Sequence, residues 1–151
     1  MNRDDVLKLD SQLCFLLYAT TRVLTQAYAG VLEPLGLTYP QYLLLLVLWE
    51  EDGSTVGYIG QRLRLDSGTV TPLVKRLEGA GLVVRERSAT DERVVEVHLT
   101  PAGRRLRDRA QDIPSAMFCQ SGLTATGAQK LAGDLRRLLE ALQPQKEEKR
   151  A

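Results

Sequence analysis

Residues 66–101 read DSGTVTPLVKRLEGAGLVVRERSATDERVVEVHLTP, and the hydrophobic pattern changes within this stretch. Its first part spaces the apolar residues as a helix does, whereas its last part alternates them as a strand does. We therefore predict a helix followed by two strands, Val83–Arg87 and Val94–Leu99. Ser88–Arg93 joins the two strands as the charged, mobile tip of a hairpin.

The start of the helix in this stretch is ambiguous. Local preferences favour Thr71 as the N-cap, with Pro72 at the first helical position. A start at Asp66 instead places Pro72 inside the helix, where it removes one backbone hydrogen bond. The residues themselves leave both starts open, and residues 79–81 end the helix in either case.

Capping residues and apolar periodicity predict five more helices. They run from Asp10, as cap, to Leu32; from Thr38, with Gln41 in a capping box, to the break at Asp52; from Thr55 to Leu63; from Thr100 and Pro101 past an interruption at Pro114; and from Thr124 through Leu142. Residues 120–122 form the loop before the last helix. The helix after Thr38 is apolar almost all round, so we expect it to be buried.

The 151 residues, of which 44% are hydrophobic, suit one folded domain with helical extensions. No run of 18 apolar residues occurs, so we expect no membrane-spanning helix. The N-terminus lacks the basic and apolar regions of a secretory signal. The expected compartment is the cytoplasm, where a deliberate disulfide is usually regulatory.

Charge is divided unevenly along the chain. Residues 1–61 carry three basic and seven acidic side chains, whereas residues 62–151 carry seventeen and twelve. Nucleic-acid affinity depends on where positive charge lies more than on the total. The basic excess begins near the predicted helix and hairpin, although a solvated charged face is an alternative explanation.

A helix, a short turn, a second helix and a β-hairpin in this order form a winged helix-turn-helix. The predicted fold class is therefore mainly α with a small β-hairpin wing. Such a unit places its second helix in the major groove of DNA and its hairpin against the minor groove or backbone. The candidate DNA-binding residues are Ser67, Thr69, Thr71, Lys75, Arg76, Arg85, Asp91 and Arg93. Asp91 is expected to hold a neighbouring arginine in place, and a winged helix that binds protein instead is the alternative.

Residues 63–103 resemble the MarR family of winged-helix regulators. The stretches that match the family's wing and the exit from it are Asp91-Glu92-Arg93, Val97-His98-Leu99-Thr100 and Gly103. Leu65–Leu73, Lys75–Glu78, Gln12–Phe15 and Leu17–Thr20 are similar to the narrower OhrR branch, the organic-hydroperoxide sensors.

The resemblance implies an obligate homodimer whose reduced form represses, and it favours a start of the second helix near Ser67. Residues 1–36 and 101–143 would be dimerisation helices, residues 37–100 the DNA-binding domain, and residues 144–151 a flexible tail.

The two cysteines suit redox chemistry. Cys14 is expected near the start of the first helix, and Cys119 in the loop before the last one. The thiolate is the reactive form, and tyrosine hydroxyls could stabilise it by hydrogen bonds. Tyr18, four residues from Cys14, shares its helix face. Tyr28 is fourteen residues away, about 21 Å along a straight helix, so it could reach this thiol only from a partner subunit.

Resemblance to the OhrR branch implies that Tyr28 and Tyr39 of one subunit hydrogen-bond the reactive thiol of the other. It also implies that an organic hydroperoxide oxidises Cys14 to a sulfenic acid, which forms an intersubunit disulfide with Cys119. The predicted function is a homodimeric repressor that binds a pseudo-palindromic operator and is released by this oxidation.

Three alternatives compete with this prediction. The first is a repressor that a small aromatic ligand releases from DNA. In such a protein the tyrosines would serve only as core or interface residues, and Cys119 would be a small buried hydrophobe. A thiol peroxidase is the second alternative, but no arginine lies beside Cys14, and the nearest, Arg22, is two turns away. A metal site is the third alternative. His98 is the only histidine, and its place in a strand predicts a surface or wing residue, so we expect no metal and no cofactor.

Overall fold

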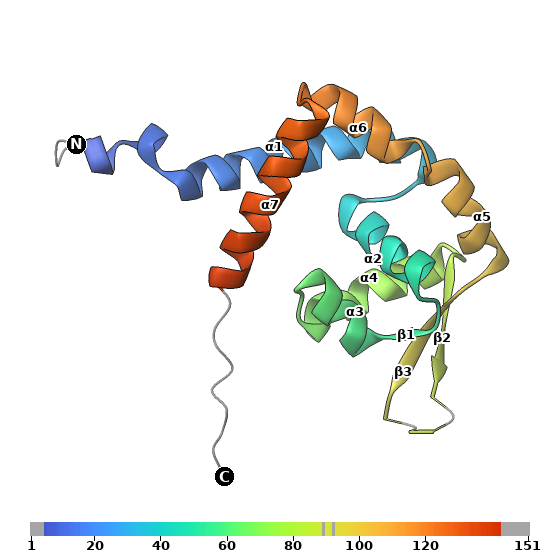
Figure 1. The fold of residues 1–151 in the computed structure, drawn as a ribbon. Helices are drawn as coiled ribbons and strands as arrows, with labels where there is room; N and C mark the ends of the chain where they lie inside the picture. The colour runs from blue at the N-terminus through green and yellow to red at the C-terminus, as the bar shows by residue number, and fades with distance from the viewer. Residues whose placement is uncertain (1–4, 89, 92, 143–151) are drawn as a thin grey trace, which may run out of the picture. The chain divides into compact units, whose positions relative to one another are not determined.

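The computed structural model describes residues 5–88, 90–91 and 93–142 of the chain (Figure 1). The helices are α1 (Leu13–Leu32), α2 (Tyr39–Glu50), α3 (Val56–Leu63), α4 (Ser67–Gly79), α5 (Pro101–Ala110), α6 (Ile113–Ser121) and α7 (Ala125–Ala141). The strands are β1 (Ser54–Thr55), β2 (Val83–Arg87) and β3 (Val95–Leu99), and the short 3-10 helices are η1 (Asp5–Leu7), η2 (Leu9–Ser11) and η3 (Glu33–Leu35). The predicted tail, residues 144–151, lies outside the described residues. Two compact units divide the chain after Pro114.

A three-stranded antiparallel sheet forms the wing, in the order β1-β3-β2. Val83 lies opposite Leu99 and Arg87 opposite Val95, which confirms the predicted hairpin. Figure 1 shows this hairpin projecting from the helices of its unit. Strand β1 was not predicted, because two residues are too short to show a period of two.

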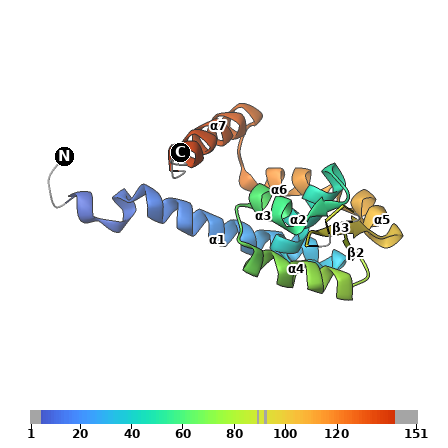
Figure 2. The ribbon, with the colours of Figure 1, turned by 90° about the horizontal axis from the view of Figure 1, so that it is seen from below.

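The core of the first unit is built around α2. Leu44, Leu45 and Leu48 of this helix are almost fully buried, which confirms the expected burial. Helices α3 and α4 pack beside α2 (Figure 2). Each fully buried leucine stabilises the fold by roughly 1.5–3 kcal/mol, so this core fixes the frame on which the hairpin and α4 are carried.

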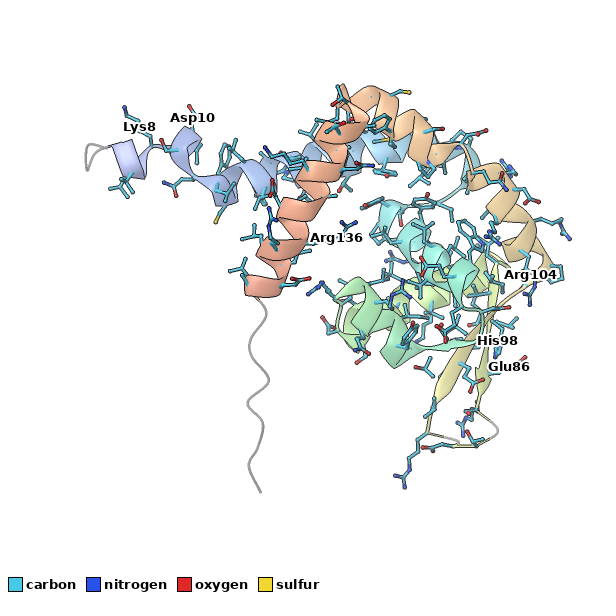
Figure 3. The ribbon with its side chains drawn as sticks, viewed as in Figure 1. Lys8, Asp10, Glu86, His98, Arg104 and Arg136 are labelled. Carbon is cyan, nitrogen blue, oxygen red and sulfur yellow. The ribbon has the colours of Figure 1, made fainter. Side chains whose placement is uncertain are left out.

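Helix α1 begins at Leu13, and the prediction of Asp10 as its cap is wrong. Asp10 lies in η2, the short helix before α1 (Figure 3). The chain makes a 3-10 turn there, and Gln12 occupies the N-cap position with its side-chain amide donating to the Val6 carbonyl. Cys14 is therefore the second residue of α1, nearer to the helix start than predicted.

Helix α4 begins at Ser67, as the family resemblance favoured, and the local preference for Thr71 as cap is wrong. The carboxylate of Asp66 accepts a hydrogen bond from the Thr69 N–H at 2.9 Å. Pro72 lies inside the helix. The missing backbone hydrogen bond costs on the order of 1 kcal/mol. Burial of Val70 and three further apolar side chains of this helix outweighs that cost.

The predicted helix starts at Thr38, Thr55, Thr100 and Thr124 are confirmed. The expected interruption at Pro114 is wrong, because α5 already ends at Ala110. Pro114 instead occupies the second position of α6, where a proline is tolerated because its missing N–H would have no helical partner.

Cys119 lies in the last turn of α6, so its predicted place in a loop is also wrong. The Ser121 hydroxyl donates to the Phe118 carbonyl at 2.7 Å, and Gly122 takes the left-handed conformation that commonly ends a helix. Of the described helices, none by itself is long and apolar enough to cross a membrane; α1 with η3 and α2 meet those criteria only as a pair bent by 69°.

Candidate nucleic-acid interface and thiol site

Helix α4, the second helix of the helix-turn-helix, turns its polar face to solvent. Ser67, Thr69, Lys75 and Arg76 are exposed, and Thr71 is half-buried. The opposite face carries the buried apolar residues of this helix. The core therefore holds α4 in place while the side chains predicted to contact DNA stay accessible.

Thr69 also belongs to the cap of α4. Its hydroxyl donates to the second carboxylate oxygen of Asp66 at 3.1 Å. The backbone and hydroxyl hydrogen bonds from Thr69 lower the pKa of Asp66, so the carboxylate is ionised at neutral pH. A hydroxyl that already donates can only accept a further hydrogen bond, which suits Thr69 to base amino groups rather than to phosphates.

Arg85, on β2, is held against α4 by Glu78. The Arg85 Nε donates to Glu78 Oε2 at 2.9 Å, and Nη2 lies 2.7 Å from the same oxygen. The backbone N–H of Arg85 donates to the other carboxylate oxygen at 3.3 Å. These hydrogen bonds from Arg85 lower the pKa of Glu78. The Glu78 carboxylate thus fixes the Arg85 guanidinium between the hairpin and α4.

A hollow of about 390 Å³ opens between the start of α3, the polar face of α4 and the hairpin. Four residues predicted to contact DNA line it: Ser67, Thr71, Arg85 and Arg93. Guanidinium and hydroxyl groups are the side chains that most often donate to phosphate oxygens and base edges. The fold therefore gathers residues from both parts of the predicted interface into one concave surface.

Asp91 holds Arg93 through the backbone. Its side chain accepts from the Arg93 N–H at 2.9 Å, and its carbonyl accepts from the Val94 N–H at 2.9 Å. The sequence predicted that Asp91 would hold a neighbouring arginine in place; the bond observed is to the backbone N–H of Arg93, and it shapes the turn at the hairpin tip. Ala89 and Glu92 of that tip lie outside the described residues.

Asp52, which the sequence suggested only as a helix break, anchors the wing. One carboxylate oxygen accepts from the Leu99 N–H at 2.7 Å, and the other pairs with Arg104 Nη1 at 2.6 Å. The end of α2 is thereby tied to the end of β3 and to the start of α5. Local sequence gives no signal for this contact, since Leu99 lies 47 positions further along the chain.

His98 lies beside Glu86 on the wing (Figure 3), as expected of a wing residue. Its Nε2 is 3.4 Å from Glu96 Oε2 and 4.0 Å from Glu86 Oε2. Within the described part of the chain, no group of three or more His, Cys, Asp or Glu side chains could hold a metal ion.

The two tyrosines expected to act on the thiol lie together. The ring centroids of Tyr28, on α1, and Tyr39, on α2, are 4.4 Å apart, and Tyr42 lies 6.1 Å from Tyr28. Burial raises the pKa of Tyr28, and the neighbouring Tyr39 and Tyr42 raise it further. Burial likewise raises the pKa of Tyr39. Both hydroxyls therefore keep their protons at neutral pH and can donate to an anion.

Cys14 lies far from this pair within its own chain. Residues 13–32 form one continuous helix, so the fourteen positions between Cys14 and Tyr28 span about 21 Å. Tyr18 is exposed, and its hydroxyl accepts from Arg22 Nη1 at 3.1 Å. Cys119 is exposed on α6 in the single chain.

Large apolar side chains are exposed on both α1 and α7. On α1 they are Leu13, Leu16, Val23 and Leu24, and on α7 they are Leu131 and Leu139, followed by Leu142. Isolated exposed apolar residues are common, whereas contiguous exposed apolar patches are typical of surfaces that bind another protein.

Comparison with known proteins identifies the family. Residues 26–110 match the family model of the transcriptional regulator SarA/Rot. The chain is 47% identical to the organic hydroperoxide resistance transcriptional regulator of Bacillus subtilis (strain 168), over 93% of this chain and 96% of the relative. This protein belongs to the MarR family, in its OhrR-like branch. The predicted resemblance is thus confirmed.

Solved structures agree with this MarR-family fold. Reduced AbfR bound to DNA, from Staphylococcus epidermidis, matches with a TM-score of 0.73 and 37% identity, over 93% of this chain and 99% of that one. Disulfide-formed AbfR matches with a TM-score of 0.60 and 35% identity, over 93% of both chains. The relatives are transcriptional regulators rather than enzymes, so this MarR-family protein is a regulator and the thiol-peroxidase alternative is wrong.

Proposed function

We propose that this regulator is a homodimeric repressor, released from its operator when an organic hydroperoxide oxidises Cys14 and a disulfide forms with Cys119 of the partner. The observation that carries the redox part is the pairing of Tyr28 with Tyr39 at 4.4 Å, about 21 Å along α1 from the chain's own Cys14. Two protonated phenols placed together are suited to a thiolate, and the thiol that they serve would come from the other subunit.

Dimerisation would bury the exposed apolar residues of α1 and α7 against a second copy of the chain. Residues 1–36 and 101–143 would form the dimer core, and residues 37–100 the DNA-binding domain. A two-fold dimer presents two copies of α4, which matches a pseudo-palindromic operator with half-sites one helical turn apart. The hollow lined by Arg85 and Arg93 would lie against the DNA. Such a regulator would work in the cytoplasm.

The oxidation needs two thiols and one peroxide. The Cys14 thiolate attacks one oxygen of the organic hydroperoxide, the O–O bond breaks, and the alcohol leaves after taking a proton. The sulfur becomes a sulfenic acid. The Cys119 thiol then attacks that sulfur, the S–O bond breaks, and water leaves as the disulfide forms. Tyr28 and Tyr39 would stabilise the initial thiolate by donating hydrogen bonds to it.

A subunit-mixing experiment tests the pairing of the two thiols. Cys14→Ser and Cys119→Ser subunits are mixed, allowed to exchange, and treated with one equivalent of cumene hydroperoxide. A mixed dimer holds one intact intersubunit pair, whereas neither variant alone holds any. We expect a dithiothreitol-sensitive, dimer-sized band on non-reducing electrophoresis from the mixture and from the wild type, but from neither variant alone. Oxidised wild type that stays monomer-sized, with no band from the mixture, would refute the intersubunit disulfide.

A further inference from the structure

We propose that Tyr42 and Trp49 are positioning residues: they transmit a displacement of the Tyr28–Tyr39 pair to the DNA-binding wing. This inference rests on the proposed redox function and names the residues through which it acts. It follows from an unbroken series of contacts along one face of α2.

The first links are ring contacts. Tyr42 is almost fully buried, and its ring centroid lies 6.1 Å from that of Tyr28. Seven positions along α2, Trp49 meets Tyr42 edge-on, with centroids 6.3 Å apart and planes at 67°. Residues seven apart lie on the same face two turns along, so one side of α2 joins the tyrosine pair to Trp49. A tilt of Tyr28 would press on Tyr42 first.

The last link is a hydrogen bond to α5. Trp49 Nε1 donates to the Gly103 carbonyl at 3.0 Å. Gly103 packs so tightly that a Cβ there would lie 2.1 Å from the Leu82 carbonyl oxygen, just before β2. That same oxygen accepts from the Thr100 N–H at 3.0 Å, just after β3. A shift of Gly103 cannot be absorbed locally and would move the base of the hairpin.

The rings also have room to move. A hollow of about 210 Å³ borders Tyr42 and Trp49 on one side and Ala110 of α5 on the other. Close-packed interiors transmit displacements, and a neighbouring space lets a side chain take a second position without overpacking. Tyr42 and Trp49 thus contact neighbouring groups on one side and border a hollow on the other, as an element with two positions requires.

The test measures the ratio of operator Kd after oxidation to operator Kd before it, in the full-length protein. Tyr42→Phe keeps the ring and serves as the matched control, so it should keep the wild-type ratio. Tyr42→Leu removes the ring, and Trp49→Phe removes the N–H donor to Gly103. We expect each of these two changes to lower the ratio by about fivefold or more, while Cys14 is still oxidised.

Trp49 is the only tryptophan in the chain, so its fluorescence reports on the last link directly. We expect oxidation to change the emission in the wild type and in Tyr42→Phe, but not in Cys14→Ser. This measurement decides the question if Tyr42→Leu fails to fold.

The outcomes separate the two proposals. Equal Kd ratios in wild type, Tyr42→Leu and Trp49→Phe, or unchanged Trp49 emission in a wild type that does release its operator, would overturn the role of Tyr42 and Trp49 alone. A wild type that oxidant does not release at all would overturn the proposed function as well.

Discussion

Glu78 decides where the Arg85 guanidinium points, because one carboxylate accepts from its Nε and lies within 2.7 Å of its Nη2. Arg85 was predicted as a DNA-binding residue, but Glu78 was not, since their contact joins a helix to a strand across the intervening turn. Tyr28 and Tyr39 were paired by the family resemblance and do lie together. The contacts of Asp52 with Leu99 and of Trp49 with Gly103 could not be predicted from the sequence, because the partners lie far along the chain.

Replacing Glu78 by glutamine should therefore weaken operator binding. Loss of the charge frees the guanidinium, which must then be ordered when DNA binds, and we expect the operator Kd to rise by about three- to tenfold. Fluorescence anisotropy with labelled operator DNA measures this change. Glu86→Gln, on the same strand but directed toward His98, is the matched control and should bind almost as the wild type does. Equal affinities for the two variants would show that Glu78 does not position Arg85.

At the scale of helices and strands, local sequence rules predicted an element correctly where a capping residue directly preceded a periodic run of apolar residues. The hairpin and the starts at Thr38, Thr55, Thr100 and Thr124 were predictable for this reason. Local rules did not settle the starts of α1 and α4. A 3-10 turn precedes α1. In α4, burial of the apolar stripe overrides the local preference for a later start at Thr71, so Pro72 lies inside the helix.

Asp66 and Asp10, the two aspartates that the sequence offered as helix caps, should contribute differently to the thermal stability of the fold. Asp66→Ala removes the N-cap of α4, and we expect it to lower the Tm by about 2–4 °C. Asp10 caps no helix, so Asp10→Ala should change the Tm by about 1 °C at most. Thermal unfolding followed by circular dichroism measures both. A larger loss for Asp10→Ala than for Asp66→Ala would contradict the observed helix starts.

The contribution of Asp66 should also depend on pH. Hydrogen bonds from Thr69 lower the pKa of this carboxyl in the folded state. Its stabilising effect is therefore present above the ordinary value of 3.8 and is lost as the pH falls through the lower, folded-state pKa. The Tm difference between wild type and Asp66→Ala should shrink as the pH is lowered below about 4. A difference that stays constant on acidification would mean that the ionised carboxylate is not the cap.

At the scale of the whole molecule, the exposed leucines and valines of α1 and the exposed leucines of α7 are the side chains that the proposed dimer would bury. Apolar periodicity predicted these helices but could not tell an intramolecular core from a dimer surface, because both need the same stripe. The structure distinguishes them by burial: Leu44, Leu45 and Leu48 of α2 are almost fully buried, whereas Leu16 of α1 remains 51% exposed.

Leu16→Glu should accordingly disrupt the dimer. A carboxylate forced into an apolar interface loses its hydration without gaining a partner, and we expect sedimentation velocity to show mainly monomer at micromolar concentration. Val84→Glu, at an apolar wing position of similar exposure, is the control and should sediment as the wild type does. A Leu16→Glu protein that remains dimeric would exclude this part of α1 from the interface.

The proposed redox switch is tested most directly by titrating operator DNA with wild type and Cys14→Ser, before and after one equivalent of cumene hydroperoxide. We expect oxidation to raise the wild-type Kd by about tenfold or more, dithiothreitol to restore it, and Cys14→Ser to bind equally well in both conditions. An unchanged wild-type Kd, or equal release of Cys14→Ser, would contradict control of this regulator through Cys14.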